Sequence, residues 1–168
     1  MKKYNFFLFI IAVALCCPLF TQAAVVEIEW IDIKKYRDIE ASNQAQKRFE
    51  ERVIKYLTGF FQTAAKEHLP DDQTLHVRIT DLDLAGDVYY FDFDQPVRIV
   101  KGMYFPRIEF SYELRDAQNQ VIKSGSENIR DMDFLLSNVK LHSTSPFRYE
   151  KKLIEDWFMN TFNNSKKS

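Results

Sequence analysis

Three acidic residues that lie close together are the strongest candidates for chemistry in this chain. Asp81, Asp83 and Asp87 surround a glycine, Gly86, and their spacing copies half of a calcium-binding loop. Carboxylate oxygens are the ligands that hard divalent cations prefer. The sequence therefore allows a metal site, and with it a metal-dependent hydrolase that uses Asp81, Asp83 and Asp87.

The residues between and after these acids favour a structural role instead. A calcium loop has an oxygen ligand at its fifth position and Glu at its twelfth, where this chain has Ala85 and Asp92. In the alternative that we favour, the carboxylates accept backbone N–H bonds in a turn and pair with arginines. Three arginines are candidate partners: Arg78, Arg98 and Arg107.

The segment that follows the acids is rich in aromatic side chains. Between Asp87 and Phe105 it holds Tyr89, Tyr90, Phe91, Phe93, Tyr104 and Phe105. These rings either fold back onto the core or form a lip that binds a ligand or a partner. The candidate binding or turn residues are thus Asp81, Asp83, Asp87, Tyr89, Tyr90, Phe91 and Arg107.

The beginning of the chain has the three parts of a secretory signal peptide. Lys2 and Lys3 precede an apolar run, and small residues at positions 21 and 23 suit a cleavage site. We predict that residues 1–23 are removed after Ala23, which places the protein in the periplasm without a stable membrane anchor. A retained anchor is the alternative.

Both cysteines of the chain, Cys16 and Cys17, lie in this predicted signal peptide, and their surroundings fit a lipidation motif poorly. Residues 24–168 contain no cysteine, so disulfides and thiolate catalysis are excluded there. That part of the chain has the length of one domain. Its charges are nearly balanced, which offers no drive toward nucleic acid. The four glycines are isolated, so no phosphate loop exists and no cofactor is expected.

The pattern of apolar residues predicts the elements that position the candidates. Alternation predicts strands over Val25–Ile33, from Leu75 to Thr80, from Pro106 onward and over Val121–Ile129, with a short one over Val97–Val100. Apolar stripes predict helices over Asn43–Glu67 and from Ser145, with Ser145 as N-cap and Pro146 at the first helical position. The alternation changes phase at Asp81, which indicates a bulge or a turned strand, and Gly125 suggests another bulge.

This order predicts an α+β fold: a two-layer sandwich with a mixed, mostly antiparallel sheet of about four strands and two main helices on one face. The helix between the first two strands implies that these strands are parallel. The other face of the sheet stays open to solvent. Charged residues should share it: Glu27, Glu29, Arg78, Arg107, Glu109 and Glu113.

Several short segments together resemble a family of small, exported proteobacterial proteins that is catalogued as a domain of unknown function. The segments are Glu29–Asp32, Tyr36–Asp38, Thr80–Gly86, Pro106–Tyr112, Arg148–Glu150 and Asp156–Phe158. The family often has proline where this chain has Ile33. The resemblance implies an envelope location and a single domain, and it brings no activity, cofactor or catalytic residue.

The sequence therefore predicts a periplasmic, non-enzymatic binding or accessory module whose ligand or envelope partner is unknown. The metal-dependent hydrolase is its rival.

Overall fold

The computed structural model describes residues 24–91, 95–136 and 145–162. The elements in chain order are β1 (Val25–Trp30), a 3-10 turn (Ile33–Lys35), α1 (Gln46–His68), β2 (Thr74–Asp83), β3 (Asp87–Tyr89), β4 (Val97–Ile99), β5 (Arg107–Arg115), β6 (Val121–Arg130) and α2 (Arg148–Phe162). Among the described residues, no helix is long and apolar enough to cross a membrane.

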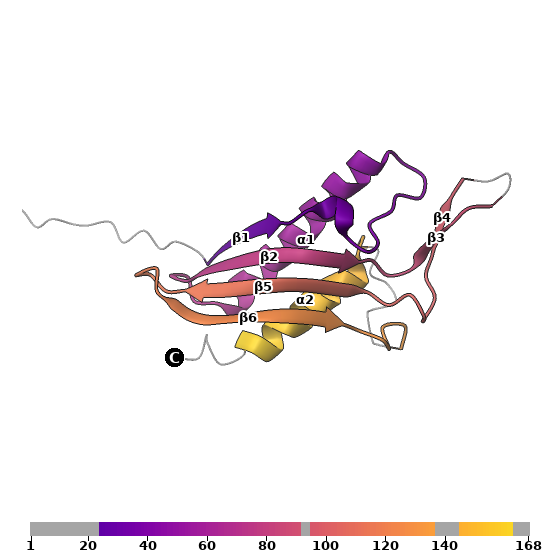
Figure 1. Ribbon diagram of the computed structural model, residues 1–168. Coiled ribbons are helices and arrows are strands. Elements are labelled where there is room, and N and C mark those ends of the chain that lie inside the picture. Colours follow the sequence, from indigo (N-terminus) through magenta and orange to yellow (C-terminus); the bar gives the residue numbers. More distant parts are fainter. Residues whose placement is uncertain (1–23, 92–94, 137–144, 163–168) are drawn as a thin grey trace, which may run out of the picture.

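Strands β1, β2, β5 and β6 form one sheet in the order β1-β2-β5-β6, with both long helices behind it (Figure 1). Strand β1 pairs with β2 in parallel, because α1 returns the chain to the same end before β2 begins. The β2–β5 and β5–β6 pairs are antiparallel. The predicted α+β fold, with an open sheet face, is confirmed.

The core lies between the sheet and the helices. The apolar stripe of α1 buries Phe49, Val53, Leu57 and Phe61, and α2 contributes Leu153, Ile154, Trp157, Phe158 and Phe162. Alternate residues of β5 face them: Ile108, Phe110, Tyr112 and Leu114. Trp30 and Phe60 are partly buried and pack against this cluster. The hydrophobic effect of burying these side chains holds the two layers together.

The phase change in β2 is a β-bulge. The pairing with β5 shifts between Ile79 and Asp81, so Asp81 and Asp83 come to the open face while Leu82 stays in the core. The prediction of a second bulge at Gly125 is wrong. Gly125 pairs in register with Tyr112, and the irregularity of this hairpin lies next to Arg115 instead.

Both predicted helix starts are wrong by a few residues. Helix α1 begins at Gln46 rather than Asn43, because Ala45 still has an extended backbone. Helix α2 begins at Arg148, and the Ser145 hydroxyl donates to the Pro146 carbonyl instead of capping the helix. The residue before Arg148, Phe147, has a positive φ of 55° and breaks the regular backbone there.

The aromatic segment is more regular than expected. The predicted strand over residues 97–100 is confirmed as β4, and it pairs with β3 in a separate two-stranded sheet. This β3–β4 pair extends beyond the end of the main sheet (Figure 1). Gly86 forms the turn between β2 and β3 with a φ of 86°, which glycine adopts readily, and the Gly86 amide donates to the Tyr104 carbonyl.

Candidate functional site

Asp81 holds together two segments at the end of β2. Its Oδ1 accepts hydrogen bonds from the backbone amides of Arg37 (2.7 Å) and Leu82 (2.9 Å). Its Oδ2 lies 2.7 Å from Nη2 of Arg107, whose side chain is largely buried. Of the three arginines that the sequence offered, Arg107 is the partner of Asp81. The carboxylate oxygens are thus occupied by N–H donors.

Asp83 faces the same side of the sheet but has a weaker partner. Its Oδ2 lies 3.9 Å from Nη1 of Arg37, an arginine that the sequence did not single out. Burial raises the pKa of the Asp83 carboxyl, and the nearby carboxylate of Asp38 raises it further. Asp38 comes close because it forms an isolated parallel bridge with Asp83.

Asp87 makes contacts of a different kind. It opens β3, and its Oδ1 accepts the amide of Val88 at 2.9 Å. Across the described residues, no group of three or more His, Cys, Asp or Glu side chains is arranged to hold a metal ion. The geometry therefore lends no support to a metal centre built on Asp81, Asp83 and Asp87.

Two sets of polar contacts beside these acids, one partly buried and one buried, were not predicted from the sequence. Arg98 binds both carboxylate oxygens of Asp38, at 2.6 and 3.0 Å, and also the carbonyls of Gly86 and Glu40. Glu150 is 2 % exposed, and its Oε1 accepts the Ala85 amide at 2.7 Å. Burial raises the pKa of the Glu150 carboxyl. Arg98 had been a candidate partner for Asp81, Asp83 and Asp87, whereas Asp38 and Glu150 were indicated only by the segments 36–38 and 148–150 of the family resemblance.

The aromatic residues of the β3–β4 segment divide into two groups. The hydroxyl groups of Tyr89 and Tyr104 form a hydrogen bond of 2.8 Å, and Lys101 lies over the Tyr89 ring. Tyr90 and Phe91 are 69 % and 51 % exposed, although the Tyr90 hydroxyl donates to Glu40. Of the two alternatives for the aromatic segment, these two side chains do not fold back onto the core. Phe93 lies outside the described residues.

Other exposed apolar side chains lie on segments at the same end of the sheet as Tyr90 and Phe91. They come from β4, from the β4–β5 connection and from the turn after β6: Val97, Val100, Met103, Met132, Leu135 and Leu136. The last two segments touch, since a Cβ on Gly102 would lie 3.8 Å from Cδ1 of Leu135. We call these eight residues the apolar end; Figure 1 shows these segments at one end of the sheet.

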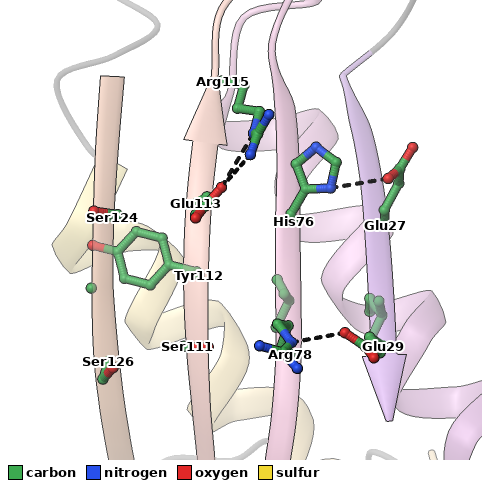
Figure 2. Close-up of a pocket in the computed structure, with 13 residues that line it drawn as sticks. Glu27, Glu29, His76, Arg78, Ser111, Tyr112, Glu113, Arg115, Ser124 and Ser126 are labelled. Carbon is green, nitrogen blue, oxygen red and sulfur yellow. Dashed lines mark hydrogen bonds and ion pairs between the residues drawn. The ribbon is translucent and has the colours of Figure 1, made fainter. Parts of the chain in front are cut away.

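The open face of the main sheet carries a wide cleft of about 710 Å³. Figure 2 shows its polar side chains, which pair across β1 and β2 or, for Glu113 and Arg115, within β5. His76 Nδ1 lies 3.0 Å from Glu27, Arg78 Nε lies 2.8 Å from Glu29, and Glu113 binds Arg115. The predicted charged face is present, and its charges largely satisfy one another.

A second cleft, of about 400 Å³, lies where the start of α2 meets α1 and the loop after β2. Its lining includes three arginines, Arg52, Arg98 and Arg148, and the buried carboxyl of Glu150. Phe49, Phe147 and Tyr149 supply aromatic walls. We call it the arginine cleft.

A comparison with known protein families matches residues 24–160 to the family described as protein of unknown function DUF3016. The chain belongs to the DUF3016 family. The match covers every helix and strand of this DUF3016 domain except the last residues of α2. The expected membership of a family of unknown function is thereby confirmed. A search of curated proteins gave no match to the chain.

Two solved structures resemble the DUF3016 domain distantly. One is a PelC dodecamer from Paraburkholderia phytofirmans, with a TM-score of 0.34 and 11 % identity over 81 % of this chain and 82 % of that one. The other is a minor lipoprotein from Acinetobacter baumannii, with a TM-score of 0.31 and 8 % identity over 86 % of this chain and 92 % of that one. At these scores the likeness carries no functional argument.

Proposed function

We propose that the protein is a non-enzymatic binding module of the periplasm and that its apolar end binds a partner protein of the cell envelope. One observation carries the proposal: eight large apolar side chains, at least 42 % exposed each, gather at the end where the β3–β4 pair leaves the main sheet. Monomeric soluble proteins rarely leave such a set uncovered without a use. Tyr, Phe and Met are also the residues that protein interfaces favour.

The charges beside the apolar end favour a protein over an anionic lipid surface. Asp131 and Asp133 flank Met132, Glu40 accepts the Tyr90 hydroxyl, and one exposed lysine, Lys101, lies between Val100 and Met103. A membrane-binding surface needs a cluster of basic residues to attract anionic headgroups, whereas these carboxylates would repel them. A protein interface instead tolerates charges of both signs at its rim.

The periplasmic location rests on the signal peptide that the sequence predicts. The described part of the chain begins at Ala24, which is 7 % exposed, and the Val25 amide already donates to the Gln73 carbonyl. Cleavage after Ala23 would leave this contact between β1 and the start of β2 intact. An envelope protein would then be the accessible partner.

Site-specific photo-crosslinking in intact cells tests the partner surface. A photoreactive amino acid at Phe91 or Met103 should give one adduct of the same discrete mass from either position. The matched control position is Ile122, which is 50 % exposed but lies in the hairpin at the other end of the sheet. The double variant Tyr90→Ser with Phe91→Ser should lose the adduct from Met103 without losing the fold.

Three results would contradict the proposal. Adducts of equal yield at Ile122 would mean that crosslinking follows exposure alone. An adduct of twice the protein's own mass would mean that the apolar end binds a second copy. Crosslinks to lipid without a protein adduct would mean that the surface lies on a membrane.

A further inference from the structure

We propose that the arginine cleft binds a small organic anion, with a carboxylate or phosphate group at Arg52 and an apolar body against Phe49 and Phe147. This site differs in its chemistry from the partner surface at the apolar end, with which it shares Val100, and its test follows Arg52 and Phe147 instead.

The guanidinium groups in the cleft differ in what they already bind. Arg98 is saturated by the two oxygens of Asp38 and by two backbone carbonyls, so its role is structural. Arg148 donates to the Tyr149 hydroxyl at 2.8 Å. Within the described residues, Arg52 forms no ion pair, and its guanidinium group lies over two aromatic rings. Arg52 is therefore the cation that an incoming anion can bind.

The single carboxyl in the lining does not compensate these charges. Glu150 is buried beneath the cleft and accepts the Ala85 amide. Burial raises the pKa of this carboxyl, which disfavours its charged form. No described carboxylate in the cleft lining therefore balances the charge of Arg52, and in a partly enclosed space an anion is attracted to it more strongly than at an open surface.

Aromatic rings form the apolar part of the cleft. The Arg52 guanidinium carbon lies 5.5 Å from the centre of the Phe49 ring and 6.0 Å from that of Phe147. The two rings lie 6.0 Å apart, and Phe147 also meets Tyr56 edge-on at 5.7 Å. Phe147 reaches this place with a φ of 55°, a costly conformation for an aromatic residue. The combination suits a molecule with one anionic group on a flat or aliphatic body.

Nuclear magnetic resonance titration tests the site on protein purified from cells that express the full chain. The probes are 4-phenylbutyrate and phenyl phosphate, and the controls are neutral 4-phenylbutyramide and inorganic phosphate. Either anionic probe should shift the signals of the Arg52 side chain and the Phe147 amide in a saturable way. The amide and inorganic phosphate should bind about tenfold more weakly or not at all, because each lacks half of the recognised chemistry.

Two variants with the same change of charge separate the cleft from general electrostatics. Arg52→Gln should weaken the anionic probe at least about tenfold, the usual effect of losing a charged hydrogen bond. Arg48→Gln lies on the same helix, is exposed and does not line the cleft, so it should bind as the wild type does. Circular dichroism should show both variants folded.

The proposal is overturned if neither probe shifts these signals. It is also overturned if the neutral amide binds as well as the acid, or if Arg52→Gln and Arg48→Gln weaken binding equally. Shifts confined to the apolar end would place the probe on the partner surface and refute the cleft.

Discussion

Replacement of Trp157 tests how the second helix holds the fold. Trp157 is 5 % exposed, and its ring lies 4.8 to 6.1 Å from five other aromatic rings. Removing a buried aromatic side chain usually costs about 3–5 kcal/mol of unfolding free energy. Edge-to-face ring pairs add about 0.5–1.5 kcal/mol each beyond burial, so we expect Trp157→Ala to fall in the upper half of that range.

Trp157→Phe provides the internal comparison. The indole Nε1 is buried, and no group in the described part of the chain accepts its hydrogen bond. An unsatisfied buried donor costs about 1–3 kcal/mol, a penalty that phenylalanine removes. Phenylalanine also keeps part of the ring packing. We therefore expect Trp157→Phe to lose less than half of what Trp157→Ala loses.

Urea unfolding at equilibrium measures both variants. The chain has two tryptophans, so the fluorescence of each variant reports on Trp30 alone. Circular dichroism provides a second probe of the same transition. A loss below about 1 kcal/mol for Trp157→Ala would mean that α2 is peripheral to the core. Equal losses for the two variants would refute the reasoning about the indole N–H.

Four further predictions concern a strand, a helix, an acid and the chain terminus. Gly125→Ala should cost about 1–3 kcal/mol, because its Cβ would lie 2.9 Å from the Tyr112 ring. Gly59→Ala, with nothing within 4 Å, should gain about 0.5–1 kcal/mol in the same urea assay. Asp83→Asn should cost little beyond about 1–2 kcal/mol, and divalent ions should leave the melting temperature of the wild type unchanged. Because the folded pKa of Asp83 lies above 3.8, its stabilising contribution is present below 3.8 and is lost as pH rises through the folded pKa. The wild type should therefore lose stability relative to the variant over that pH range. In the separate test with divalent ions, a rise in melting temperature that Asp83→Asn abolishes would restore the metal hypothesis. Mass spectrometry of the exported protein should find Ala24 as the first residue, and a lipid on Cys16 or Cys17 would refute that.

Local patterns predicted the scaffold well because burial imposes them residue by residue. The alternation in β5 and the stripe of α1 follow directly from which side chains meet the core. The bulge in β2 was visible because the apolar positions changed phase at Asp81. The bulge predicted at Gly125 was wrong. A glycine stands there because the Tyr112 ring approaches closely, not because the strand has an extra residue. Tertiary packing of that kind leaves no periodic signal.

The candidate site was harder to predict because its partners are distant in sequence. Arg107 was among the candidates for Asp81. Arg37 was not, because it lies in the loop after β1 and comes near Asp81 and Asp83 only in the folded chain. The bond from Ala85 to Glu150 joins residues 65 positions apart. Amino-acid types and spacing indicate that such groups need partners, whereas the folded topology decides which partners they find.

The sheet also sets the orientation of the molecule relative to its own amino terminus. Ala24 enters β1 at the end of the sheet away from the β3–β4 pair (Figure 1). The ten residues of β2 separate these two ends by about 33 Å. If the leader were retained in a membrane, Tyr90 and Phe91 would lie at the end of the sheet away from the point of attachment. With the leader retained, the apolar end would meet soluble partners. After cleavage, the molecule could rotate freely, and the same surface could also reach partners in either membrane.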